Sequence, residues 1–120
     1  MTVEMICKIA PYDYWVVCKR FESGHRAGYV GIPDGHPLFG RDVDWPALRQ
    51  MNTPLGQITY AASKVGGWEG HPKDELRWWF GIDNMHEDEP EDSMADILSA
   101  CFALARELRD YGRERKRGDV

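Results

Sequence analysis

Hydrophobic positions gather in three stretches of the first third of the chain, separated by short polar turns, and this pattern predicts β-strands. Residues 3–9 and 14–21 are rich in β-branched and aromatic side chains and flank a Pro-Tyr-Asp turn, which predicts an antiparallel hairpin. A third strand, residues 27–32, ends at a Pro-Asp-Gly turn. Its two glycines, Gly28 and Gly31, indicate that other groups pack closely over its backbone.

Two further strands are predicted later in the chain, at residues 57–62 and 76–83. The last of these places large aromatic side chains on both of its faces, which predicts a position inside the sheet rather than at its edge. One face carries Trp78, Phe80 and Ile82, and the other carries Trp79, Gly81 and Asp83.

Helical spacing predicts a short helix at residues 45–51, with Asp44 as its cap and Pro46 in its first turn. A long helix at residues 93–111 has an apolar stripe that must be buried against the sheet. We therefore predict an α+β fold, an antiparallel sheet of about five strands covered on one face by the C-terminal helix. Residues 1–112 are expected to form one domain, and the basic residues 113–120 a flexible tail. The stripe consists of Ile97, Leu98, Cys101, Leu104, Ala105, Leu108 and Tyr111.

The composition is that of a globular protein, with 42% hydrophobic and 29% charged residues in a chain of 120. No stretch approaches the roughly 18 apolar residues that span a bilayer, and the first residues lack the basic start and apolar core of a signal peptide. We therefore expect a protein of the bacterial cytosol with no membrane contact. In that compartment Cys7, Cys18 and Cys101 are expected to be reduced thiols that pack as small apolar side chains, with metal ligands or a redox pair as the alternative. The hairpin turn sets Cys7 opposite Val16.

The formal net charge is −5, and much of the negative charge lies between residues 83 and 96, where there are carboxylates but no Lys or Arg. Such a chain is poorly suited to bind nucleic acid directly, because that affinity comes largely from cations. Glu91 and Asp92 are accounted for by the positive end of the C-terminal helix, whereas Glu87, Asp88 and Glu89 lie too far upstream. A solvated loop is the favoured interpretation of these three, and a docking surface for a basic host protein is the alternative.

Trp68 lies in a long glycine-rich loop at residues 63–75. We favour a lid over the core for this side chain and keep a partner contact as the alternative. The candidate partner-binding residues are therefore Trp68, Glu87, Asp88, Glu89, Glu91 and Asp92.

Two of the predicted strands are each followed in sequence by a histidine that lies next to a proline or to carboxylates. We expect these glycine-spaced aromatic strands to lie side by side, so that their corners bring together His36, Asp83 and His86. Two imidazoles and one carboxylate are enough to bind a divalent metal with open positions that activate water. The favoured interpretation is structural, because a His before Pro often forms a turn and an Asp at a strand end often caps one. Apart from this metal, no cofactor is expected, and no motif for nucleophilic or nucleotide chemistry is found.

Three segments, AGYVGIPDGHPLFGRDVD, QITYA and WWFGID with a following histidine, resemble a group of small proteins encoded by bacteriophages and prophages. The likeness spans residues 27–86 and implies no activity. Where that group has cysteines, this chain has Ala27 and Asn84, and the Gly-Asp pair after His86 is replaced by Glu87 and Asp88. A metal site with thiolate ligands would therefore have lost those ligands here.

These features favour a phage-derived, non-enzymatic protein that binds a host component, for example a defence protein such as a CRISPR effector. The alternative is a metal-dependent hydrolase or nucleotide-handling enzyme that uses His36, Asp83 and His86, with Asp88 as base. A third hypothesis is a small-molecule sponge in which the loop with Trp68 closes over a nucleotide. The sequence does not determine the oligomeric state.

Overall fold

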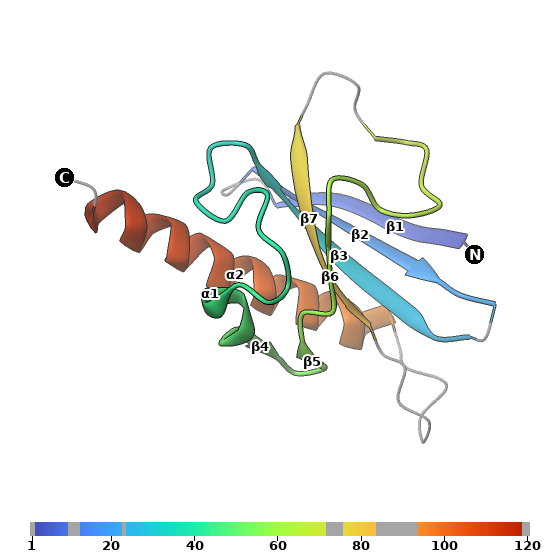
Figure 1. The fold of residues 1–120 in the computed structure, drawn as a ribbon. Helices are drawn as coiled ribbons and strands as arrows, with labels where there is room; N and C mark the ends of the chain where they lie inside the picture. Colours follow the sequence, from blue (N-terminus) through green and yellow to red (C-terminus); the bar gives the residue numbers. More distant parts are fainter. Residues whose placement is uncertain (1, 10–12, 23, 72–75, 84–93, 119–120) are drawn as a thin grey trace.

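The computed structural model describes residues 2–9, 13–22, 24–71, 76–83 and 94–118. They form a five-stranded antiparallel sheet with the long helix α2 (Met94–Gly118) packed on one face (Figure 1), so the predicted α+β fold is confirmed. Across the sheet, the strands follow the order β1 (Thr2–Ile9), β2 (Tyr14–Arg20), β3 (Arg26–Pro33), β7 (Arg77–Asp83) and β6 (Tyr60–Ala62).

The predicted strand at residues 57–62 is divided in the structure. Its first part becomes β5 (Gly56–Gln57), which pairs with β4 (Asn52–Thr53) in a separate two-stranded sheet, and only β6 joins the main sheet. The short helix α1 (Pro46–Arg49) has proline in its first turn as predicted, but its N-cap is Trp45 rather than Asp44, and no side chain caps it.

The C-terminal helix is longer than predicted. We expected it to end at Tyr111 and to be followed by a flexible tail, whereas α2 continues to Gly118. The physical reason is that Arg, Glu and Lys after Gly112 favour helix and no proline interrupts them. The start of the predicted helix, at Ser93, lies outside the described residues.

The larger of two cores lies between the sheet and α2, and we call it the helix-side core. Its side chains come from β2, β3, β7 and α2, and α2 packs mainly against β3. Burying each large aliphatic or aromatic side chain stabilises the fold by about 1.5–3 kcal/mol. The fully buried members include Val16, Val30, Ile32, Phe80, Ile82, Ile97, Leu104 and Leu108.

The opposite face of the sheet carries a smaller, aromatic core that is covered by the loop at residues 63–71, and we call it the loop-side core. Trp79 is fully buried at its centre, with Val17, Tyr29 and Val65 buried around it. The strand β7 thus supplies both cores, with Phe80 and Ile82 on the helix side and Trp79 on the loop side, as its sequence pattern predicts.

Glycine and aromatic residues face each other reciprocally between β3 and β7. Gly31 pairs with Trp79 and Tyr29 pairs with Gly81. A Cβ added at Gly31 would lie 2.8 Å from the Trp79 ring, and one added at Gly81 would lie 2.8 Å from the Tyr29 ring. Each ring therefore occupies the space that a side chain on the neighbouring strand would fill, which explains the glycine spacing of both segments.

Candidate functional site

The two aromatic strands lie side by side as predicted, but their corners do not meet. The strands β3 and β7 are antiparallel, with Ala27 opposite Asp83 and Pro33 opposite Arg77. The turn with His36 therefore leaves one end of the sheet and Asp83 lies at the other, about 20 Å away at the usual rise per residue. Because the C-terminal ends of adjacent antiparallel strands lie at opposite ends of the sheet, His36 and Asp83 do not share a pocket, and that expectation was wrong.

His36 has a structural role in the turn after β3. Its Nδ1 accepts the Leu38 N–H at 3.0 Å, so Nε2 carries the proton and donates to the Leu108 carbonyl at 2.7 Å. The ring is buried and lies near Tyr14 and Tyr111, with centroids 6.0 and 6.5 Å away. Both nitrogens are thus engaged within the protein, in agreement with the favoured structural interpretation.

His86 and the predicted docking residues Glu87, Asp88, Glu89, Glu91 and Asp92 lie outside the described residues. Within the described parts of the chain, no three His, Cys, Asp or Glu side chains come together as metal ligands.

Asp83 instead lines a pocket on the loop side of the sheet, at the end where β7 finishes. The pocket has a volume of about 190 Å³. Its lining combines three aromatic side chains with the hydroxyl of a threonine and the carboxylate of Asp83. The lining residues are Phe21, Ala27, Tyr29, Thr59, Tyr60, Gly81, Ile82 and Asp83.

The polar groups of the pocket are fixed by hydrogen bonds. Thr59 Oγ1 donates to Asp83 Oδ2 at 3.1 Å, and the Thr59 N–H donates to the Gly81 carbonyl at 2.9 Å. The Tyr29 and Tyr60 rings meet edge to face with centroids 5.1 Å apart, and the Tyr60 hydroxyl donates to the Lys64 carbonyl. Burial raises the pKa of Tyr29, and Tyr60 and Asp83 add to this, so Tyr29 remains a neutral phenol.

Lys19 is a buried cation next to this pocket. Only 5% of the residue is exposed, and its ammonium donates to the Gly66 carbonyl at 2.9 Å. The same ammonium lies 5.2 Å from the centroid of Phe21 and 5.0 Å from that of Tyr29, within the range of cation–π attraction. Burial lowers the pKa of Lys19.

Trp68 packs on the loop-side core, as the lid interpretation predicts. Its ring meets Trp79 edge to face at 5.7 Å and lies 4.2 Å from the His71 ring. His71 accepts the Val65 N–H at Nε2, at 3.1 Å, which closes the loop on itself. The half-buried Trp68 therefore covers the sheet beside Trp79.

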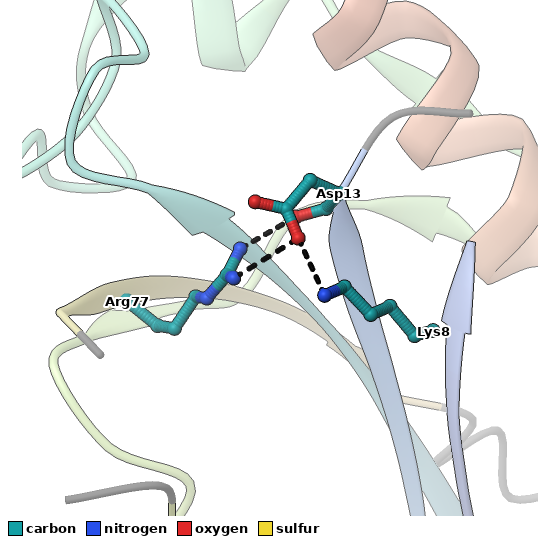
Figure 2. Close-up of polar contacts among 3 residues, drawn as sticks. All are labelled: Lys8, Asp13 and Arg77. Atoms are coloured by element: carbon teal, nitrogen blue, oxygen red, sulfur yellow. Dashed lines mark hydrogen bonds and ion pairs between the residues drawn. The ribbon is translucent and has the colours of Figure 1, made fainter. Parts of the chain in front are cut away.

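The other end of the sheet is held by a polar cluster around Asp13, in the turn between β1 and β2 (Figure 2). Its Oδ1 lies 2.8 Å from Lys8 Nζ and 3.3 Å from Arg77 Nη2, and Arg77 also donates to its backbone carbonyl. Asp13 has a φ of 57°, a conformation that Asp tolerates better than most residues. The Lys8 hydrogen bond, together with Arg77, lowers the pKa of Asp13. This cluster ties the first hairpin to β7.

The sequence pointed to Asp83 but missed the other members of its pocket. Alternation along β2 and β3 places Lys19 and Tyr29 on the same face, and a lysine inside the apolar run YWVVCKR was the available signal. No local sequence pattern predicted that Thr59 and Tyr60 would lie at this pocket, because their position depends on where β6 pairs along β7.

No model of a known protein family matches the chain, and comparisons with curated protein sequences and with solved structures also give no match. Among the described helices, none is long and apolar enough to cross a lipid bilayer.

Proposed function

We propose that this chain is a phage-derived, non-enzymatic protein that binds a host protein, and that the pocket at Asp83 receives a basic side chain of that partner. The observation that carries the proposal is the combination of an anchored carboxylate with the Tyr29 and Tyr60 rings around one small pocket. A carboxylate pairs with a guanidinium or ammonium group, and aromatic rings attract the same cations. The phage origin rests on the resemblance of residues 27–86 described above.

The size and charge of the site support a side chain rather than a larger ligand. Pockets for drug-sized molecules usually span roughly 300–1,000 Å³, whereas this one has about 190 Å³. The net charge of −5 and the carboxylates that follow Asp83 in the sequence favour a basic partner surface. Host proteins that handle nucleic acid present such surfaces, and a defence protein such as a CRISPR effector is the kind of partner that we propose.

Lys19 makes a specific contribution to this proposal. Its ammonium shows that the Phe21 and Tyr29 rings are placed to attract a cation, but its positive charge also opposes a second cation. Replacing Lys19 with Met should therefore strengthen the binding of a basic probe, while loss of the Asp83 charge should weaken it.

The test is calorimetric titration of the full chain with a tetra-arginine peptide. Asp83→Asn and Tyr60→Leu should each weaken binding by about tenfold, and Lys19→Met should strengthen it. Asp34→Asn is the matched control, because Asp34 is exposed in the turn after β3, at the opposite end of the sheet. Equal affinity of Asp83→Asn and Asp34→Asn would overturn the basic anchor.

The partner itself is tested by retention of host lysate proteins on the immobilised chain. Retained proteins, identified by mass spectrometry, should be lost in Asp83→Asn and on charge reversal of Glu87, Asp88 and Glu89, and they should elute with salt. Retention that is unchanged by all of these substitutions would overturn an acidic docking face.

A further inference from the structure

Three sulfur-containing side chains lie in one row across the helix-side face of the sheet. Met5 of β1 pairs with Cys18 of β2, and Cys18 pairs with Gly28 of β3. Directly opposed residues of antiparallel strands share a face, with Cβ atoms about 5 Å apart. The third sulfur belongs to Cys101 of α2 and lies over Gly28. All three side chains belong to the helix-side core or pack against it.

The absence of a side chain at Gly28 brings the Cys101 sulfur close to the sheet. A Cβ at Gly28 would lie 2.3 Å from this sulfur, so the sulfur occupies nearly the position that a β3 side chain next to Cys18 would take. The Cys18 and Cys101 thiols hydrogen-bond to each other, which lowers the pKa of Cys18 and, together with burial, raises that of Cys101. Cys101 is therefore the donor of this pair, and Cys18 is the first of the two to become a thiolate.

Two thiols and a thioether form a soft set of ligands. Soft sulfur ligands select Cu(I), whereas a structural zinc site takes four Cys or His ligands. Two metal–sulfur bonds of about 2.3 Å each can join sulfurs up to about 4.6 Å apart. The hydrogen-bonded thiols of Cys18 and Cys101 are thus close enough for one ion to bridge them, with the Met5 sulfur as a third ligand.

The row also has a path by which an ion can enter. Cys18 and Cys101 are fully buried, whereas Met5 and Cys7 are half-buried at the margin of the helix-side core. Because α2 packs mainly over β3, the β1 end of the row lies outside the main packing of the helix. An ion that enters at this margin meets the thioether of Met5 first and then the two thiols.

We propose that Met5, Cys18 and Cys101 form a binding site for one Cu(I) ion. On binding, the two thiols release their protons to solvent as two copper–thiolate bonds form, and the Met5 sulfur donates a lone pair. The copper stays Cu(I), so no oxidant or reductant takes part. This site and the pocket at Asp83 lie on opposite faces of the sheet, and the inference does not depend on the proposed function.

Anaerobic titration of the reduced chain with Cu(I), in competition with the chelator bicinchoninate, tests the site. The wild-type chain should bind one ion, and Cys18→Ala and Cys101→Ala should each weaken binding by at least about 100-fold with unchanged circular dichroism spectra. Cys7→Ser is the matched control and should bind as the wild type does, because Cys7 pairs with Val16 and lies outside the row. A wild-type chain that does not bind, or a Cys7→Ser chain that loses as much affinity as the other two, would overturn the site.

X-ray absorption at the copper edge identifies the ligands in the wild-type chain without any substitution. The spectrum should show sulfur neighbours only, and nitrogen or oxygen neighbours would overturn the proposed ligand set. Met5→Leu removes the thioether sulfur but keeps an apolar side chain, so it should weaken Cu(I) binding by about tenfold. Unchanged affinity of this variant would overturn the role of Met5 as a ligand.

Discussion

The imidazole of His36 donates a hydrogen bond to the Leu108 carbonyl at 2.7 Å, and so connects the turn after β3 to α2. That carbonyl belongs to a helix, and the contact is close because Gly112, one turn later, has no side chain. A Cβ at Gly112 would lie 3.2 Å from Nε2 of His36. The histidine of the GHP sequence thus holds the helix against the sheet.

This contact predicts a coupling between His36 and Gly112. His36→Ala should lower the free energy of unfolding by about 2–3 kcal/mol, because the buried Leu38 N–H loses its acceptor and the ring leaves a cavity. Gly112→Ala should stabilise the wild-type chain less than it stabilises the His36→Ala chain. Ala favours the helix over Gly by about 1 kcal/mol, and without the His36 ring nothing crowds the added methyl group. Urea unfolding of the four proteins measures the coupling, and additive effects would contradict the contact.

A second prediction concerns Gly28, which lies beneath α2. A Cβ at this position would lie 2.3 Å from the Cys101 sulfur, so Gly28→Ala should destabilise the chain by about 1–3 kcal/mol through overpacking. Adding Cys101→Ala should remove most of that cost, because the conflicting sulfur is gone. Thermal unfolding of the single and double variants checks this, and Gly35→Ala serves as control because a Cβ there meets nothing within 4 Å. Equal costs with and without Cys101 would contradict the prediction.

The loop at residues 63–71 should respond to acid through His71. Burial lowers the pKa of His71, so the folded chain binds its proton less readily than the unfolded chain. The stability that depends on the neutral ring is therefore complete above pH about 6.5 and is lost as the pH falls through the lower folded pKa. Protonation also removes the acceptor of the Val65 N–H.

Tryptophan fluorescence between pH 7.5 and 4.5 should report this change, since Trp68 and Trp79 both contact the His71 ring. His71→Gln should remove the acid-induced shift, whereas His25→Gln should retain it. An identical shift in both variants would assign the transition to other groups.

A fourth prediction concerns the cluster in Figure 2. Asp13→Ala should destabilise the chain by about 1–2 kcal/mol, because the nearly buried Arg77 loses a carboxylate partner and Ala tolerates a positive φ poorly. Asp13→Asn should cost less, because Asn keeps an acceptor oxygen and adopts this conformation readily. Chemical denaturation at neutral pH measures the free energies of unfolding of the wild-type, Asp13→Asn and Asp13→Ala chains. An Asn variant as unstable as the Ala variant would contradict this explanation.

Local patterns in the sequence predicted much of the fold. The aromatic content and glycine spacing of residues 27–32 and 76–83 predicted neighbouring strands, and the turn chemistry predicted the pairing of Cys7 with Val16 that the structure has. The glycines of β3 do lie under close-packed groups, Cys101 on one face and Trp79 on the other. These features depend on residues close in sequence or on the regular period of a strand.

The candidate site was less predictable, because it depends on strand direction and pairing. The direction of β7 against β3 separates His36 from Asp83, and the pairing of β6 with β7 brings Tyr60 and Thr59 to the pocket. The burial of Lys19 depends on Gly66, in a distant loop. Hydrophobic periodicity encodes which face a residue occupies, but not the end of the sheet at which its partners gather.

The two faces of the sheet are covered very unequally, by a helix of 25 residues on one side and by the loop at residues 63–71 on the other. Side-chain contacts with Trp79 and the Lys19–Gly66 hydrogen bond hold that loop, rather than the ladder of backbone hydrogen bonds that holds a strand, so it can detach while the helix-side core stays intact. Amide hydrogen exchange should therefore separate into two tiers: fast exchange near Val65 and Trp68, and slow exchange, limited by global unfolding, in β3 and the middle of α2.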